Sequence, residues 1–301
     1  GASFPLTGPQ LAHTVHLGPL WFYILAIPGL IFASWSGMAL LAFFLSALKF
    51  WLAYDFGKKL HSTQLGIFFA LFLALPSWSS IQLIIWTHTI VLETALLLYL
   101  LSLRRSFLFP GAGNWLLTGF CFSLALHAHP TALPYLVLLS LAWRPLLQKW
   151  YWIVCLAVGV AVPFLPYGFE QLLNGFPDLV ALQNYYTNEV SPGGPFTMLK
   201  LLYSVVVIGP NLYYRTALPA NLAAIAIVVH WLLILVMLGL CLLKPRTTEL
   251  RLKRLLAAAV SILLIVVVAV VLMRARTLWH LAYAPSFALA FLYAVVATIA
   301  C

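Results

Sequence analysis

Charged side chains are scarce in this sequence: of its 301 residues, 16 are Lys or Arg and only 6 are Asp or Glu. Charged residues make up 7% of the chain and apolar residues 64%, whereas a soluble domain carries roughly a quarter charged residues. The mean hydropathy is +1.05. This composition excludes an ordinary soluble domain and predicts a chain whose backbone polar groups are paired inside helices within a bilayer.

Strand patterns and paired cysteines are also missing. No run of about ten residues alternates apolar and polar positions, which excludes an outer-membrane barrel. The cysteines lack CxxC spacing and sit singly in or beside apolar segments, so we interpret them as small core residues rather than a disulfide set or a metal site. They are Cys121, Cys155, Cys241 and Cys301.

The few charges are sorted along the chain. Lysine and arginine recur in alternate gaps between apolar stretches, at 58–59, 104–105, 144–149 and 244–254, and the other gaps hold most of the acids and histidines. Because short basic loops are retained in the cytoplasm, this alternation predicts a polytopic membrane protein with an acidic, histidine-rich exoplasmic face. The net charge of +10 is then a topology signal that also meets anionic lipid, and no nucleic-acid partner is expected.

The apolar segments predict an all-α fold, a transmembrane bundle of about nine to eleven helices, because one span needs about 20 apolar residues. We interpret residues 1–301 as one transmembrane domain. Residues 1–16 are expected to be the tail of an exoplasmic loop whose first helix lies upstream, and 168–195 a later exoplasmic loop. Residues 17–33, broken by two prolines, suit a short or re-entrant element. The predicted spans are 36–54, 65–79, 90–103, 114–126, 131–143, 152–167, 218–243, 255–273 and 285–300, with 196–208 ambiguous.

Glu93 is the sharpest candidate for chemistry on the exoplasmic face. It stands at the head of an apolar helix, where a carboxylate is costly without a partner or water. Two interpretations stay open. Glu93 is a structural group bonded to a neighbouring helix or to Arg276, or it serves in acid–base catalysis, acceptor binding or metal ligation.

Arg274 and Arg276 follow an apolar helix and precede His280 and Tyr283. They are either interfacial anchors or a clamp for an anion. The positive-inside tendency disfavours arginine on this face, and guanidinium groups bind phosphate in a bidentate manner. The two arginines are therefore candidate phosphate ligands.

The histidines do not show metal-ligand spacing. His127 and His129 diverge on a helix, and the proline at 130 biases His129 away from helical geometry. His88 and Glu93 are five positions apart, a poor spacing for one metal. No metal site is predicted, and any cofactor is left open. Tyr185 and its neighbour either stack on a sugar ring or belong to the interfacial aromatic belt.

Four segments carry a resemblance to a known family: HLGPLWFY at 16–23, IVLET at 90–94, LHAHPTA at 126–132 and LWHLAYAP at 278–285. In this order they resemble the C-type (GT-C) superfamily of integral membrane glycosyltransferases, and most of all the bacterial relatives of protein O-mannosyltransferase and of the lipid A aminoarabinose transferase. The resemblance implies an exoplasmic active site fed by a polyprenyl-phosphate sugar. On this basis Glu93 is the catalytic candidate. The donor-phosphate candidates are Arg274, Arg276, His280 and Tyr283, and the substrate-binding candidates are His16, Tyr23, His88, His129 and Tyr185.

The sequence departs from the family pattern in two places. The family's first exoplasmic loop carries a catalytic aspartate, whereas residues 1–16 contain no acid; SWSG at 34–37 stands where an arginine often follows. Either the aspartate lies upstream of Gly1, or another carboxylate serves, or this member is inactive.

The predicted function is transfer of a sugar from a polyprenyl-phosphate donor to a lipid, glycan or protein acceptor, at the exoplasmic face of a bacterial inner membrane. The alternatives are a transporter or flippase of an anionic lipid, and a non-catalytic relative. A transporter would carry ionisable groups near the helix middles, and the sequence shows almost none there.

Overall fold

The computed structural model describes residues 5–11, 15–32, 34–60, 62–74, 91–142, 146–147, 149–184 and 218–243. Within these ranges the chain is helical apart from one two-stranded antiparallel ribbon, in which β1 (Gln10–Leu11) pairs with β2 (Val15–His16). The predicted all-α class is therefore confirmed, with the ribbon as a small addition. The predicted spans at 196–208, 255–273 and 285–300 lie outside the described residues.

Three consecutive helical elements run back and forth and supply most of the core. They are α5 (Leu92–Leu108), α6 (Ala112–Ala128) and the 3-10 helix η2 (Pro130–Ala142). α6 ends at Ala128, two residues beyond the predicted end at 126, and His129 then adopts an extended conformation (φ −168°, ψ 142°) ahead of the proline. A buried hydrogen bond of 2.8 Å between the hydroxyls of Ser106 and Thr118 joins α5 to α6 near their connection.

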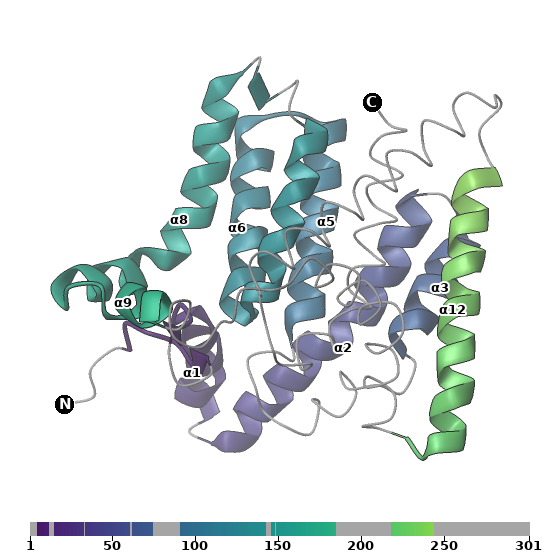
Figure 1. Ribbon diagram of the computed structural model, residues 1–301, viewed down its shortest axis with the longest axis horizontal. Coiled ribbons are helices and arrows are strands. Elements are labelled where there is room, and N and C mark those ends of the chain that lie inside the picture. Colours follow the sequence, from purple (N-terminus) through teal and green to yellow (C-terminus); the bar gives the residue numbers. More distant parts are fainter. Residues whose placement is uncertain are drawn as a thin grey trace.

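The helix α8 (Trp150–Leu173) lies alongside α6 and parallel to it (Figure 1). Their facing residues repeat every four positions. The rings of Trp115 and Trp152 stack at 6.3 Å, and the hydroxyl of Ser123 donates to the Val160 carbonyl at 2.9 Å. Because every fourth residue returns to about the same face of a helix, the two helices stay in register over several turns.

Glycines set how closely α6 and α8 approach. A Cβ placed on Gly119 would clash with the Leu156 carbonyl oxygen, and one on Gly159 would clash with the Leu116 carbonyl oxygen. Backbone thus meets backbone on both sides of the contact. Small residues at such positions are typical of helix pairs in membranes, where packing rather than the hydrophobic effect drives association.

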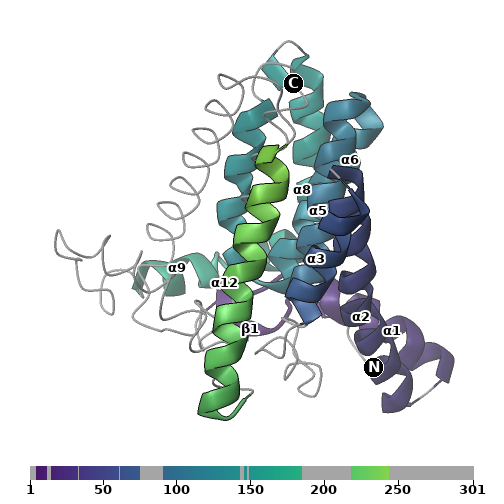
Figure 2. The same ribbon diagram turned by 90° about the vertical axis from the view of Figure 1, so that its right-hand side faces the viewer.

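The remaining helices flank this centre. α2 packs against α3 and α5, α1 packs against α2, and α12 lies along α3 (Figures 1 and 2). The ring of His230 in α12 contacts Phe72 of α3, with 4.7 Å between ring centroids. The bounds are α1 (Leu20–Phe32), α2 (Trp35–Leu60), α3 (Thr63–Ala74) and α12 (Ala220–Leu243).

The prediction that residues 168–195 form a loop is wrong for the first part of this range. α8 continues to Leu173, and α9 (Pro177–Asn184) follows after a tight turn. Gly168 does not end α8; Gly175 does, at φ 72°, where the amide of Phe176 donates to the Gln171 carbonyl at 2.7 Å. This is a Schellman arrangement, in which a left-handed glycine satisfies the last carbonyls of a helix. Residues 185–195 lie outside the described residues.

Two of the described helices are long and apolar enough to cross a membrane, Trp35–Lys59 within α2 and α8 itself. The core helix of a soluble protein would pass the same test, but it would be mostly buried. Here only 28% and 22% of the most apolar windows of α2 and α8 are buried. Large apolar side chains on both helices are exposed, among them Trp35, Phe44 and Trp51 of α2 and Val162 and Leu165 of α8.

We expect Gly159→Val to lower the free energy of unfolding by about 1–3 kcal/mol, because an added side chain must push α6 and α8 apart. Gly113→Val is the matched control, since a Cβ at Gly113 meets no atom within 4 Å. Thermal unfolding of the purified protein in detergent measures both. Equal stability of the two variants would contradict the close approach.

Candidate functional site

The described helices collect basic and histidine-bearing residues at opposite ends of the bundle. Lys58 and Lys59 lie in the last turn of α2, and Arg105 lies in the last turn of α5. These ends meet, because the guanidinium of Arg104 donates to the Lys59 carbonyl at 2.9 Å. α8 begins at this same end, which we call the basic end. The start of α5, the end of α6, β2 and α9 lie at the other end, which we call the histidine end (Figure 1).

Glu93 lies in the first turn of α5, as predicted, and it is 6% exposed. Its Oε2 accepts a hydrogen bond of 2.7 Å from Nζ of Lys49 in α2, which is also buried. Burying both charges is costly, and their mutual attraction offsets that cost only while both partners are present. The pair therefore fixes α2 against α5. This is the contact with a neighbouring helix that the structural interpretation of Glu93 requires.

Lys49 is the residue that the sequence analysis missed. It stands ten residues before Lys59 in α2, a rise of about 15 Å at 1.5 Å per residue. The pair is thus displaced from the basic end by about half the thickness of a hydrocarbon core. The expectation that helix middles hold almost no ionisable groups is wrong at this position. A lysine inside an apolar helix was the available signal, because such a residue usually has a partner.

An apolar recess opens beside this ion pair, among α1, α2, α5 and α6. It is a half-open recess, and its empty space comes to about 460 Å³ only when the adjoining open space is counted. Thr94, the residue after Glu93, lines it and donates to the Leu45 carbonyl at 2.7 Å. The lining is otherwise apolar except for one histidine; it comprises Leu20, Trp21, Ile24, Leu45, Val91, Thr94, Ala95, Leu98, Leu124, His127 and Ala128.

His127 and His129 take different roles at the end of α6. Nδ1 of His127 lies 2.8 Å from the Ser123 carbonyl, so this nitrogen is the donor. The ring also packs on Phe164 of α8, at 3.9 Å between centroids, and lies against Gly18, where a Cβ would clash with it. His129 is buried as the C-cap of the helix. The two histidines thus have different surroundings at the end of α6.

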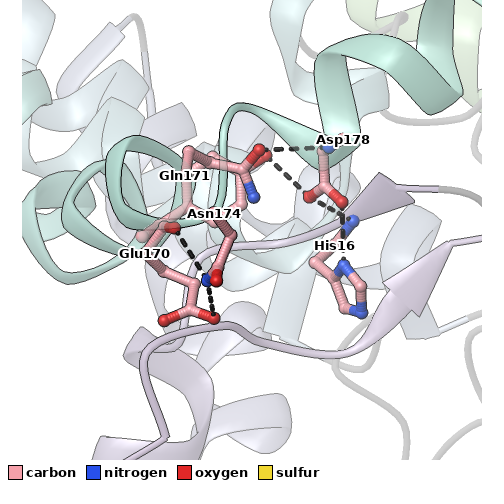
Figure 3. A network of polar contacts seen from close by, with 6 residues as sticks. His16, Glu170, Gln171, Asn174 and Asp178 are labelled. Carbon is pink, nitrogen blue, oxygen red and sulfur yellow. Dashed lines mark hydrogen bonds and ion pairs between the residues drawn. The ribbon is translucent and has the colours of Figure 1, made fainter.

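Asp178 is the centre of a polar network at the histidine end (Figure 3). Its carboxylate accepts from His16 twice, from the backbone N–H to Oδ2 and from ring Nδ1 to Oδ1, both at 2.9 Å. The Tyr167 hydroxyl donates to Oδ2 at 2.9 Å, and the Asp178 amide donates to Oε1 of Gln171 at 3.1 Å. The carboxylate is almost fully buried, so these donors replace water. No local pattern in the sequence marks Asp178, since its main partner is 162 residues away.

Tyr23 ties α1 to the segment before the ribbon. Its hydroxyl donates to the Pro5 carbonyl at 2.6 Å. Partial desolvation raises the pKa of the Tyr23 phenol above its usual value of 10.0, so the hydroxyl is neutral at pH 7. Tyr23 lies on the α1 turn that also brings Trp21 and Ile24 to the recess.

The structure thus describes four of the predicted site residues, which are Glu93, His16, Tyr23 and His129. It gives Glu93 and His16 different charged partners, Lys49 and Asp178. The other predicted residues lie outside the described residues: His88, Tyr185, Arg274, Arg276, His280 and Tyr283. Within the described ranges, no group of three or more His, Cys, Asp or Glu side chains converges as a metal site would require.

Comparison with known proteins adds no family to this description. No protein-family model matches the sequence, and neither the curated proteins nor the solved structures give a significant match.

Breaking the buried pair should be far more costly than removing both charges. We expect Glu93→Leu or Lys49→Met alone to lower the free energy of unfolding by about 3–5 kcal/mol, and the double variant to recover most of that loss. Asp55→Asn, which breaks the exposed pair with Lys59, should cost less than about 1 kcal/mol. Thermal unfolding in detergent measures all four; additive losses in the double variant would show that the two charges do not depend on each other.

Proposed function

We propose that this chain is a multi-pass membrane glycosyltransferase, which moves a sugar from a polyprenyl-phosphate donor to an acceptor at the exoplasmic face. The observation that carries the proposal is one juxtaposition at the histidine end. An apolar recess lined by Trp21, Thr94 and Leu124 opens beside ionisable side chains, while the basic residues of the described helices gather mainly at the far end. An amphipathic lipid-linked substrate needs both surfaces side by side.

Orientation in the membrane follows from the charge distribution. The basic end carries Lys58, Lys59, Arg104 and Arg105, and short basic segments are retained in the cytoplasm. The histidine end then faces the exoplasm. The apolar outer surfaces of α2 and α8 support the location of the bundle in a bilayer, because these surfaces would otherwise be exposed to water.

In this proposal the recess takes the first isoprene units of the donor. Its lining is apolar apart from Thr94 and His127. The donor phosphate is assigned to Arg274 and Arg276, with His280 and Tyr283, on the strength of the family resemblance and of the preference of guanidinium for phosphate. In the reaction, the acceptor attacks the anomeric carbon and the phosphate leaves with the electron pair, so a cationic clamp stabilises the charge that develops on it.

Glu93 keeps its assignment as a catalytic candidate only if it gives up its structural partner. Its burial and the 2.7 Å bond to Lys49 support the structural alternative, in which the carboxylate holds α2 beside the recess. The group that accepts the acceptor's proton is then to be sought elsewhere at the histidine end.

One observation favours the second candidate, a transporter or flippase of an anionic lipid. Secondary transporters carry ionisable groups near the bilayer midplane. Lys49 lies within the span of α2 rather than at its end, whereas its partner Glu93 lies in the first turn of α5. Chemical turnover of the donor separates the two candidates, because a flippase leaves its lipid intact.

Membrane orientation is tested with single cysteines in a variant without the four native ones. We expect a membrane-impermeant maleimide to label Asn174→Cys, in the exposed turn before α9, from the exoplasmic side of intact cells. Ala112→Cys, exposed at the start of α6 near the basic end, should be labelled only after permeabilisation. Labelling of both positions from one side would contradict the proposed topology.

Filling the recess should weaken donor binding. We expect Leu124→Trp to reduce the affinity for a radiolabelled polyprenyl-phosphate monosaccharide by about tenfold or more, because the added ring occupies the space assigned to the isoprene chain. Leu126→Trp is the matched control, two positions along α6, partly buried but outside the recess lining.

Binding is measured on purified protein in lipid nanodiscs, across a panel of such donors. Equal affinities of the two variants would remove the recess from the donor site. Failure of the unsubstituted protein to bind any donor of the panel would contradict the proposed function itself.

A further inference from the structure

The His16 side chain is held in one orientation by a buried carboxylate. Asp178 binds the backbone amide of His16 through Oδ2 and the ring Nδ1 through Oδ1, so both the main chain and the ring are fixed by a single group. Asp178 is itself fixed by Tyr167 and Gln171. The imidazole therefore has little freedom to rotate about its side-chain bonds.

This contact determines which ring nitrogen carries the proton. An ionised carboxylate only accepts hydrogen bonds, so Nδ1 of His16 is the donor. In the neutral ring, Nε2 then presents its lone pair. The ring's second nitrogen points away from Asp178 (Figure 3), and among the described residues Nε2 makes no hydrogen bond.

The His16 side chain is more exposed than the buried polar groups at the histidine end. Its side chain is 35% exposed, whereas that of Asp178 is 6% exposed. A partly exposed imidazole whose Nδ1 is bonded to a buried carboxylate is the arrangement of a general base and its orienting partner.

His16 also lies close to the recess along the chain. Gly18, two residues further, packs directly on His127, which lines the recess, and Leu20 and Trp21 form part of its wall. Two residues of extended chain span about 7 Å. The imidazole is thus near the place where the sugar end of a donor seated in the recess would emerge.

We infer that His16, oriented by Asp178, is the general base that accepts the proton of the acceptor; this inference rests on the proposed glycosyl transfer. The acceptor hydroxyl or amine forms a bond to the anomeric carbon, and the bond from that carbon to the phosphate oxygen breaks with its electron pair on the phosphate. The acceptor's proton moves to Nε2. The resulting imidazolium is stabilised by Asp178 and later releases the proton to water.

The assignment supplies a proton acceptor from within the described residues. It makes His16 a catalytic residue and Asp178 a positioning residue. Among the described residues, the titratable groups at His16 are Asp178 of α9 and Tyr167 of α8. Glu170, on the same stretch of α8, is bonded to Asn174 instead.

The test follows conversion of a radiolabelled polyprenyl-phosphate sugar to free polyprenyl phosphate, with native membrane lipids and proteins as acceptors. We expect His16→Gln to lower turnover by about 100-fold or more, since general base catalysis contributes about 10²–10⁴ in rate. Donor affinity should stay within about twofold, because the glutamine amide can still donate to Asp178 and preserve the clamp. Glu170→Gln, at a neighbouring half-buried carboxylate that bonds Asn174, is the control and should keep full turnover.

A structural role is distinguished by chemical rescue. In His16→Ala, added imidazole should restore part of the turnover, with a pH dependence that follows the titration of free imidazole. Asp178→Asn should also lower turnover, and its pH profile should shift because the orienting charge is lost.

Full turnover of His16→Gln would overturn the inference. So would a loss of turnover in His16→Ala that imidazole does not restore, provided that this variant unfolds at the wild-type temperature. If the wild type binds the donor and converts it while His16 proves dispensable, the transferase proposal stands and the dyad fails. If the wild type neither binds nor converts any donor, both fail.

Discussion

The close approach of α6 to α8 is the contact on which the rest of the described bundle depends. Glycines on both helices remove the side chains that would hold the backbones apart, and the register of Trp115 with Trp152 and of Ser123 with Val160 follows from it. The same register seats His127 on Phe164. One face of α6 packs on α8 and another face packs on α5. The recess forms where α1 and α2 meet α5 and α6.

The sequence predicts those features that depend on neighbouring residues. The all-α class follows from the apolar runs, and the end of α6 follows from the proline after His129. The alternation of charge predicts that successive basic segments lie at the same end of the bundle. Arg104 and Lys59, from two such segments, are in contact there. Local signals also mislead, because Gly168 looks like the start of a loop. The helix continues past it to Gly175, where a hydrogen-bonded left-handed turn stops it.

The candidate site was less predictable because its groups find partners far along the chain. Glu93 could be singled out as a carboxylate in need of a partner, but Lys49 lies 44 residues earlier. His16 could be singled out by a motif, but the carboxylate that orients it is 162 residues later. Nothing in the local sequence distinguishes Asp178, in a short polar helix, from an exposed loop acid. Only the packing of the ribbon on α9 gives it its burial and its partners.

The distance between Lys49 and Glu93 along the chain has a consequence for synthesis. If α2 enters a bilayer as it leaves the ribosome, it does so before its counter-charge on α5 has been made, and a lysine near a helix centre opposes insertion by about 2.5–3.5 kcal/mol. The remaining apolar residues of α2 must outweigh that cost, or α2 must wait beside the insertion machinery until α5 emerges. The ion pair thus makes the order of translation part of the assembly of the bundle.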